Sequence, residues 1–144
     1  MNERKRKNYS RRLFEAVLDG DASRVRALLR AGADPGRPDR EGTTPLYEAS
    51  VNGRTGVARV LLRAGAAPDA ESAGLGAEGT PLCAAACWGH TATVRELLAH
   101  GADPNLREEH GTGRTPLEWA RDGGHPGTAD VLVAAGAALP ARSG

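Results

Sequence analysis

Four copies of one short phrase divide the chain into units of similar length. The copies read RAGADP, RAGAAP, AHGADP and AAGAAL, and their glycines lie at positions 32, 65, 101 and 136. A second phrase begins with Thr-Pro at Thr44, Thr80 and Thr115. The glycines are 33, 36 and 35 residues apart, and the surplus three and two residues lie between a glycine and the next Thr-Pro. A period of 33 residues therefore underlies the chain. Such a period is typical of repeat proteins whose neighbouring units share one core.

Each unit is predicted to form a helix, a turn, a second helix and a loop. In the third unit, Thr80 is suited to cap the free amides of a helix, and Pro81 fits the first helical position, where no hydrogen bond is lost. Gly89 is suited to the left-handed conformation that ends this helix, and Gly101 to the end of the next one. The apolar faces of the two helices consist of Leu82, Ala85 and Ala86, then Val94, Leu97 and Leu98. Helices this short are marginal alone, so the units must stack to bury these faces.

The first and last units depart from the pattern of the middle two. Arg11 and Arg12 replace Thr-Pro in the first unit. In the last unit, Arg121 occupies the stacking position that holds Val17, Ser50 and Ala86 elsewhere. A charged residue fits a stacking position only where no further repeat packs against it, so we expect a complete array that is capped at both ends. The predicted division is a basic, disordered tail over 1–10, a repeat domain over 11–140 and a short tail over 141–144. The four repeats cover about 11–40, 41–76, 77–110 and 111–140.

These motifs resemble the ankyrin repeat over about Arg11 to Leu139. The resemblance rests on Thr-Pro-Leu, Ala, Gly-His and Leu-Leu-x-x-Gly-Ala-Asp at the 33-residue period. It implies an all-α fold, a solenoid of four stacked helix-turn-helix repeats with finger loops, which binds other proteins. The chain departs from the family after Thr-Pro-Leu, where the family's frequent His is Tyr47, Cys83 or Glu118. The hydrogen bonds that this His makes between repeats are therefore not implied.

The resemblance also implies where a protein partner would bind. In ankyrin proteins the contact surface is made by the finger loops and by the exposed end of each first helix. Carried over by register, the partner-binding positions are Arg40, Glu41, Thr43, Val51, Asn52, Glu78, Cys87, Trp88, Thr112, Arg114 and Asp122. The same register adds Leu18, Asp19, Ala77 and Gly123. We expect Trp88 to be the main contact, because tryptophan is enriched among the residues that dominate binding energy. Tyr47 is predicted to lie in the core, and Trp119 to cover its end.

Three patterns that resemble chemical sites lack the context that such sites need. The loop GLGAEG, 74–79, has the spacing of a dinucleotide fingerprint, but no buried strand precedes it. Cys83, Cys87 and His90 supply only three ligands, whereas a closed zinc site needs four. The other histidines occur singly at turns, without a nucleophile nearby. We therefore expect no catalytic, cofactor-binding or metal site, and a protein that is not an enzyme.

Charge and cysteine content indicate the setting. Residues 1–12 contain six basic residues and one acidic residue, whereas the remaining 132 have a net charge of −4. The folded part therefore lacks the clustered cations that nucleic acids require. The alternative function is a nucleic-acid-associated adaptor that uses the basic N-terminal tail. No secretory or membrane-spanning segment is evident, and the two cysteines fit a reducing compartment. We expect a cytoplasmic monomer with an unidentified protein partner and no membrane contact.

Overall fold

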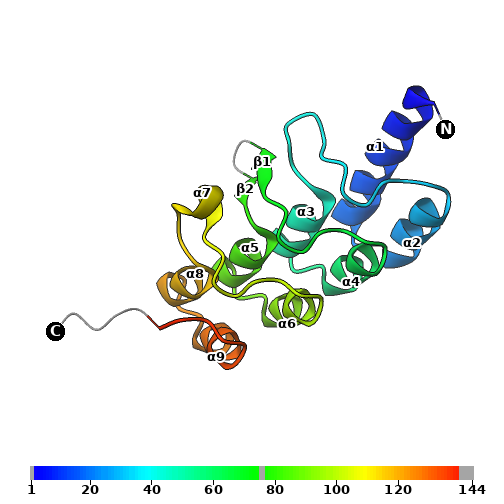
Figure 1. Ribbon diagram of the computed structural model, residues 1–144. Helices are drawn as coiled ribbons and strands as arrows, with labels where there is room; N and C mark the ends of the chain where they lie inside the picture. The colour runs from blue at the N-terminus through cyan, green and yellow to red at the C-terminus, as the bar shows by residue number, and fades with distance from the viewer. Residues whose placement is uncertain (1, 75–76, 140–144) are drawn as a thin grey trace.

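The computed structural model describes residues 2–74 and 77–139, which form two parallel rows of helices. Within each row every helix packs against the next, and the two rows face each other across the core (Figure 1). The first row consists of α1 (Glu3–Asp19), α3 (Pro45–Val51), α5 (Pro81–Cys87) and α8 (Pro116–Asp122). The second row consists of α2 (Ala22–Arg30), α4 (Thr55–Arg63), α6 (Thr91–Ala99) and α9 (Pro126–Ala134). The predicted solenoid of stacked helix pairs is confirmed.

The repeated Thr-Pro phrase starts three helices of the first row in the same way. The Thr80 hydroxyl accepts a hydrogen bond from the Cys83 amide at 3.2 Å. Thr44 and Thr115 cap α3 and α8 identically, at 3.1 and 3.2 Å. A proline follows each threonine at the first helical position, where its missing amide costs nothing. Local sequence therefore determines where these helices begin.

Small residues bring the first-row helices close together. Four alanines at the same place in the repeat are fully buried: Ala16, Ala49, Ala85 and Ala120. Their single methyl groups let adjacent backbones approach closely, while leucines fill the remaining space of the core. The fully buried leucines are Leu13, Leu61, Leu82, Leu97, Leu117 and Leu132. One apolar core therefore runs through all the repeats.

In each later repeat, the residue immediately before the second helix forms a hydrogen bond to the preceding repeat. His90 Nε2 lies 3.1 Å from the Val51 carbonyl oxygen, and His125 Nε2 lies 3.1 Å from that of Cys87. In the second repeat, Arg54 donates to the Leu18 carbonyl at 3.2 Å. These bonds occupy carbonyls at the ends of first-row helices, which have no partner within the helix.

Two residues that replace the family's histidine also link repeats. The Tyr47 hydroxyl donates to the Glu78 carbonyl at 3.2 Å, and the Cys83 thiol donates to the Arg114 carbonyl at 3.6 Å. Each bond reaches the finger of the following repeat. Tyr47 is buried, as expected.

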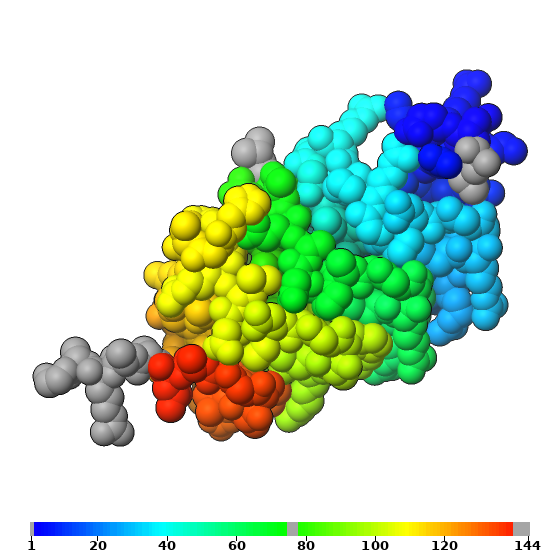
Figure 2. All heavy atoms as spheres, viewed as in Figure 1, coloured from blue at the N-terminus to red at the C-terminus, as the bar shows by residue number. Residues whose placement is uncertain are grey.

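The two lengthened fingers contain short regular elements that the sequence patterns did not predict. In the second, β1 (Ser72–Gly74) pairs antiparallel with β2 (Ala77–Gly79), with Ser72 opposite Gly79. The third contains the single turn α7 (Glu108–Gly111), in which Glu109 and His110 have φ values of 53° and 55°. The fingers project along one edge of the stack (Figure 2).

The N-terminal segment corrects one expectation. Residues 3–10, predicted to be a disordered tail, belong to α1, whose start is capped by the Asn2 side chain accepting from the Lys5 amide at 2.9 Å. Tyr9 packs against the core and extends it beneath this part of the helix. The tail predicted over 141–144 lies outside the described residues. Within the described chain, no helix combines the length and apolar character needed to cross a bilayer.

The stacking position of the second repeat holds a buried hydroxyl without a partner. Val17, Ser50 and Ala86 are all 0% exposed. Arg121, at the same position of the last repeat, is exposed to solvent. Ser50 Oγ is the one buried side-chain polar atom in the described residues that makes no hydrogen bond. Burying an unsatisfied hydroxyl destabilises the folded state.

We therefore expect Ser50→Ala to raise the free energy of unfolding by about 1 kcal/mol, because it removes the unpaired hydroxyl and keeps the packing volume. Urea denaturation followed by circular dichroism measures the change. Ala86→Ser introduces the same defect one repeat later and should lower stability by about 1–2 kcal/mol. A destabilised Ser50→Ala protein would contradict this account of the stacking position.

Candidate functional site

The ends of the first-row helices and the finger loops form the inner surface, which contains the positions expected to bind a partner. Most of the expected side chains are exposed, and two others, Val51 and Cys87, are half-buried. The exposed ones are Arg40, Glu41, Asn52, Glu78, Trp88, Thr112, Arg114 and Asp122. Asn52 turns back onto its own helix, where its amide donates to the Glu48 carbonyl at 2.8 Å.

Trp88 is the most exposed large apolar side chain of the inner surface. It follows α5 directly and is 62% exposed. Gly89 follows Trp88 and ends this turn of the chain. Its φ of 71° is a left-handed conformation that glycine adopts easily. An indole this exposed leaves a large apolar area in water, which a binding partner would cover.

Thr43 is a correction to the expected set. Its side chain is 4% exposed, and its amide donates to the Asp39 carboxylate at 3.0 Å. The Asp39 amide in turn donates to the Thr43 carbonyl at 2.9 Å, which closes the tip of the first finger. Thr43 therefore shapes the finger, and its side chain is inaccessible to a partner.

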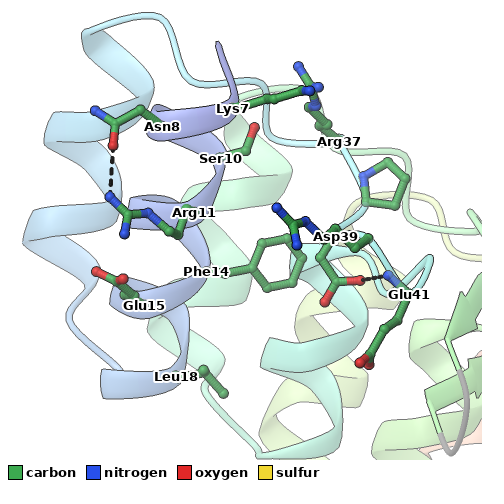
Figure 3. A pocket seen from close by; sticks show the side chains of 12 residues that line it. Lys7, Asn8, Ser10, Arg11, Phe14, Glu15, Leu18, Arg37, Asp39 and Glu41 are labelled. Carbon is green, nitrogen blue, oxygen red and sulfur yellow. Dashed lines mark hydrogen bonds between the residues drawn. The ribbon is translucent and has the colours of Figure 1, made fainter. Parts of the chain in front are cut away.

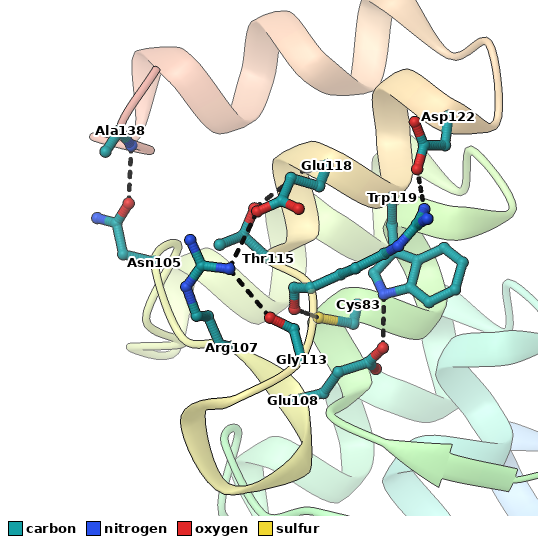
Figure 4. A network of polar contacts seen from close by, with 11 residues as sticks. Cys83, Asn105, Arg107, Glu108, Gly113, Thr115, Glu118, Trp119, Asp122 and Ala138 are labelled. Carbon is teal, nitrogen blue, oxygen red and sulfur yellow. Dashed lines mark hydrogen bonds and ion pairs between the residues drawn. The ribbon is translucent and has the colours of Figure 1, made fainter. Parts of the chain in front are cut away.

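A network of polar contacts joins the third finger to α8 (Figure 4). Arg114 forms an ion pair with Asp122 and places its guanidinium carbon 4.9 Å from the centre of the Trp119 ring. Trp119 Nε1 donates to the Glu108 carboxylate at 2.7 Å. Trp119 is half-buried against the core, at the end where it was expected. The network connects Arg114 and Asp122, both on the inner surface, to Trp119 and Glu108.

Glu108 is a partly desolvated carboxylate within this network. Burial raises its pKa, and the neighbouring carboxylates Glu109 and Glu71 add to the increase. The Trp119 hydrogen bond and the Arg114 charge oppose it, because both favour the ionised form. The net shift is upward, so ionised Glu108 is less favourable in the folded protein than in the unfolded chain.

The third finger is also attached to the second. The His110 amide donates to Glu71 Oε1 at 3.0 Å, and His110 Nδ1 lies 3.0 Å from Glu71 Oε2. Arg107 donates to the Gly113 carbonyl at 3.0 Å and forms an ion pair with Glu118 at 3.2 Å. The His110 contacts join the third finger to the second, and the Arg107 contacts close the third finger and join it to α8.

Two of the three residues considered as metal ligands, Cys83 and His90, make contacts within the fold. Cys83 is buried, and burial raises the pKa of its thiol to about 12. His90 contacts a backbone carbonyl of the preceding repeat. Within residues 2–74 and 77–139, no group of three His, Cys, Asp or Glu side chains is arranged to hold a metal ion. In the glycine-rich segment considered for nucleotides, Gly74 ends β1 and residues 77–79 form β2, while residues 75–76 lie outside the described residues.

A groove at the N-terminal end was not predicted as a unit. It lies between α1 and the first finger and has a volume of about 940 Å³ (Figure 3). The register supplied only Leu18, Arg40 and Glu41 of its lining. The lining residues that it missed are Lys7, Asn8, Ser10, Arg11, Phe14, Glu15, Arg37, Pro38 and Asp39. A sequence signal existed in the helical spacing of Lys7, Arg11, Phe14 and Leu18, but it is visible only if the helix is extended through residues 3–10.

The architecture and the exposed inner surface define a helical-repeat protein of the kind that binds other proteins. Comparison with known families matches residues 71–142, half of the chain, to "Ankyrin repeats (3 copies)" and residues 41–73 to "Ankyrin repeat". The chain belongs to the ankyrin-repeat family, whose members are generally protein–protein interaction modules. No curated protein matches it.

Replacing Glu108 with glutamine should change how stability depends on pH. The unfolded chain ionises Glu108 near an ordinary glutamate pKa of about 4.3, whereas the folded protein ionises it at a higher pH. The folded state therefore binds more protons in this window, and the wild type loses stability as pH rises through it. Glu108→Gln lacks this loss and can still accept from Trp119.

The free energies of unfolding of both proteins, measured in urea from about pH 4 to neutral pH, provide the test. We expect the wild type to lose stability relative to Glu108→Gln as pH rises. A constant difference, or one that favours the wild type at neutral pH, would contradict the assignment of a desolvated carboxylate.

The two thiols should differ in reactivity, because alkylation requires an exposed thiolate. Cys83 is buried, whereas Cys87 is half-buried and its pKa is raised less strongly, mainly by burial. Iodoacetamide at about pH 8 should therefore modify Cys87 first and leave Cys83 protected, as peptide mass spectrometry would show. In urea both should react at similar rates. Equal reactivity in the folded protein would show that α5 is not packed as described.

Proposed function

We propose that this protein binds a protein partner through its inner surface, with Trp88 as the central contact. The observation that carries the proposal is the exposed indole of Trp88 at the end of α5, in the middle of the stack. Within the described residues only Leu139, at 61%, approaches its exposure among large apolar side chains. Covering an indole removes more apolar area from water than covering any other side chain.

The surroundings of Trp88 have the composition of a protein interface. The half-buried Val51 and Cys87 extend the apolar centre. Exposed charged side chains of both signs lie on the same inner surface, among them Glu78, Arg114 and Asp122. An apolar core with a polar rim is the usual arrangement in protein–protein interfaces.

The inner surface is also held in place before binding. His90 and His125 bond the ends of two first-row helices to the next repeat. A surface that is already ordered loses little conformational freedom on association, which favours affinity. This supports a function in recognition.

Three further parts of the proposal follow the same reasoning. The protein acts as a binding module without catalysis and functions as a monomer. It resides in the cytoplasm, where its free thiols Cys83 and Cys87 suit the reducing conditions. Whether it inhibits, protects or assembles its partner depends on the identity of that partner.

Removing the Trp88 indole should weaken binding by at least about tenfold, because hot-spot tryptophans contribute more than about 1.4 kcal/mol. Affinity capture from the native cell identifies the partner, and titration of the purified pair by calorimetry measures the affinity. Trp88→Ala should keep the wild-type circular dichroism spectrum, since the side chain is mainly in solvent.

Leu139→Ala is the matched control, because Leu139 is as exposed as Trp88 but follows the last helix. It should bind like the wild type. A partner that binds Trp88→Ala with unchanged affinity would overturn the central role of this residue and of the surface around it.

A further inference from the structure

The groove beside α1 exists because this helix is much longer than its counterparts. α1 has 17 residues, whereas α3, α5 and α8 have 7 each. Its additional turns run past the base of the first finger and form one wall of the groove, and the finger forms the other (Figure 3). From Lys7 to Leu18 this wall is about 16 Å long, which is the length of about five residues of extended chain.

The floor of the groove is apolar and open. Phe14 points from α1 towards the first finger and is half-buried (Figure 3). It is not among the side chains that pack against the core, although Tyr9 in the same helix is. Leu18, one turn further along, is 52% exposed. An aromatic and a leucine side by side in a groove form a site for an apolar side chain of a partner.

Around this floor, two of the carboxylates have partners within the fold, whereas three of the cations form no ion pair among the described residues. Of the carboxylates, Asp39 accepts from the Glu41 and Thr43 amides at 2.9 and 3.0 Å, and Glu15 lies 3.7 Å from Arg24. Among the described residues, no ion pair forms at three cations that line the groove, namely Lys7, Arg11 and Arg40. The groove therefore offers three cations without an ion-pair partner, whereas Asp39 and Glu15 already have partners within the fold, and among the described lining carboxylates Glu41 alone makes no such contact.

We propose that this groove binds an acidic peptide segment of the protein partner, with one aromatic or long aliphatic side chain of that segment on Phe14 and Leu18. The segment's carboxylates pair with Lys7, Arg11 and Arg40. This inference rests on the proposed function as a protein-binding module and assigns it a second contact, at the N-terminal end of the inner surface and away from Trp88. The apolar floor of Phe14 and Leu18 favours a peptide, which can place an apolar side chain there, over a nucleic-acid backbone, whose phosphates need no apolar contact.

A phage-displayed library of random short peptides, selected on the purified full-length protein, tests the proposal. We expect enriched peptides to combine aspartate or glutamate with an aromatic or leucine residue. The most enriched peptide, labelled with a fluorophore, then gives affinities by fluorescence polarisation. Failure to enrich any peptide, or enrichment of basic peptides, overturns the proposal.

Two neighbouring arginines of α1 provide a matched pair of variants. Arg11 lines the groove, whereas Arg12 is exposed outside it. Arg11→Glu should weaken peptide binding at least about tenfold, and Arg12→Glu should change it less than about threefold, because only the first reverses a charge in the groove. Equal losses would indicate attraction by overall charge and contradict a defined site. Phe14→Ala should also weaken binding about tenfold, with unchanged circular dichroism.

Two additional measurements separate the remaining explanations. A mixed-sequence single-stranded DNA oligonucleotide should not displace the peptide, and displacement would replace this proposal with nucleic-acid binding by α1. Trp88→Ala should bind the peptide like the wild type, because Trp88 lies outside the groove. Loss of peptide binding in Trp88→Ala would refute the groove and support the central surface. If Trp88→Ala binds both the peptide and the whole partner with wild-type affinity, only the proposed contact at Trp88 is refuted.

Discussion

Burial of small apolar faces between successive repeats is the interaction on which the rest of this structure depends. A helix pair of seven and nine residues cannot remain folded alone, because its few hydrogen bonds do not offset the entropy of ordering the chain. Alanines at one repeated position, such as Ala85, let adjacent first-row helices approach until the leucines beneath them are fully buried. Each repeat therefore owes its stability to its neighbours, as in other linear arrays.

The polar contacts between repeats convert this stack into a binding surface. His90 and His125 reach back to carbonyls of the preceding repeat, and Tyr47 and Cys83 reach forward to the next finger. These bonds fix how each repeat sits on the next, so exposed side chains from separate units are presented together. The chain lacks the family's frequent histidine after Thr-Pro-Leu, yet a phenol and a thiol still make bonds between repeats.

Much of the fold followed from local rules, whereas the site followed only in part. Thr80 and Gly89 act within a few residues, so the start and end of α5 were predictable from the sequence. The hairpin of the second finger was not, because the Ala73 amide donates to the Gly42 carbonyl of another finger at 3.0 Å. The burial of Thr43 has the same origin, since the side chain packs against Gly74. Such contacts join residues about one repeat apart, and no local pattern encodes them.

The sequence by itself determined the number of repeats and the helix boundaries set by Thr-Pro and glycine, whereas the resemblance supplied the expected position of Trp88 at a helix end. These features depend on residues close together in the chain and on a period that can be counted. Only the tertiary structure decided that residues 3–10 continue α1, and that Phe14 and the first finger enclose a groove. The physical reason is that a short basic segment has no strong preference of its own, and its conformation depends on core contacts such as those of Tyr9.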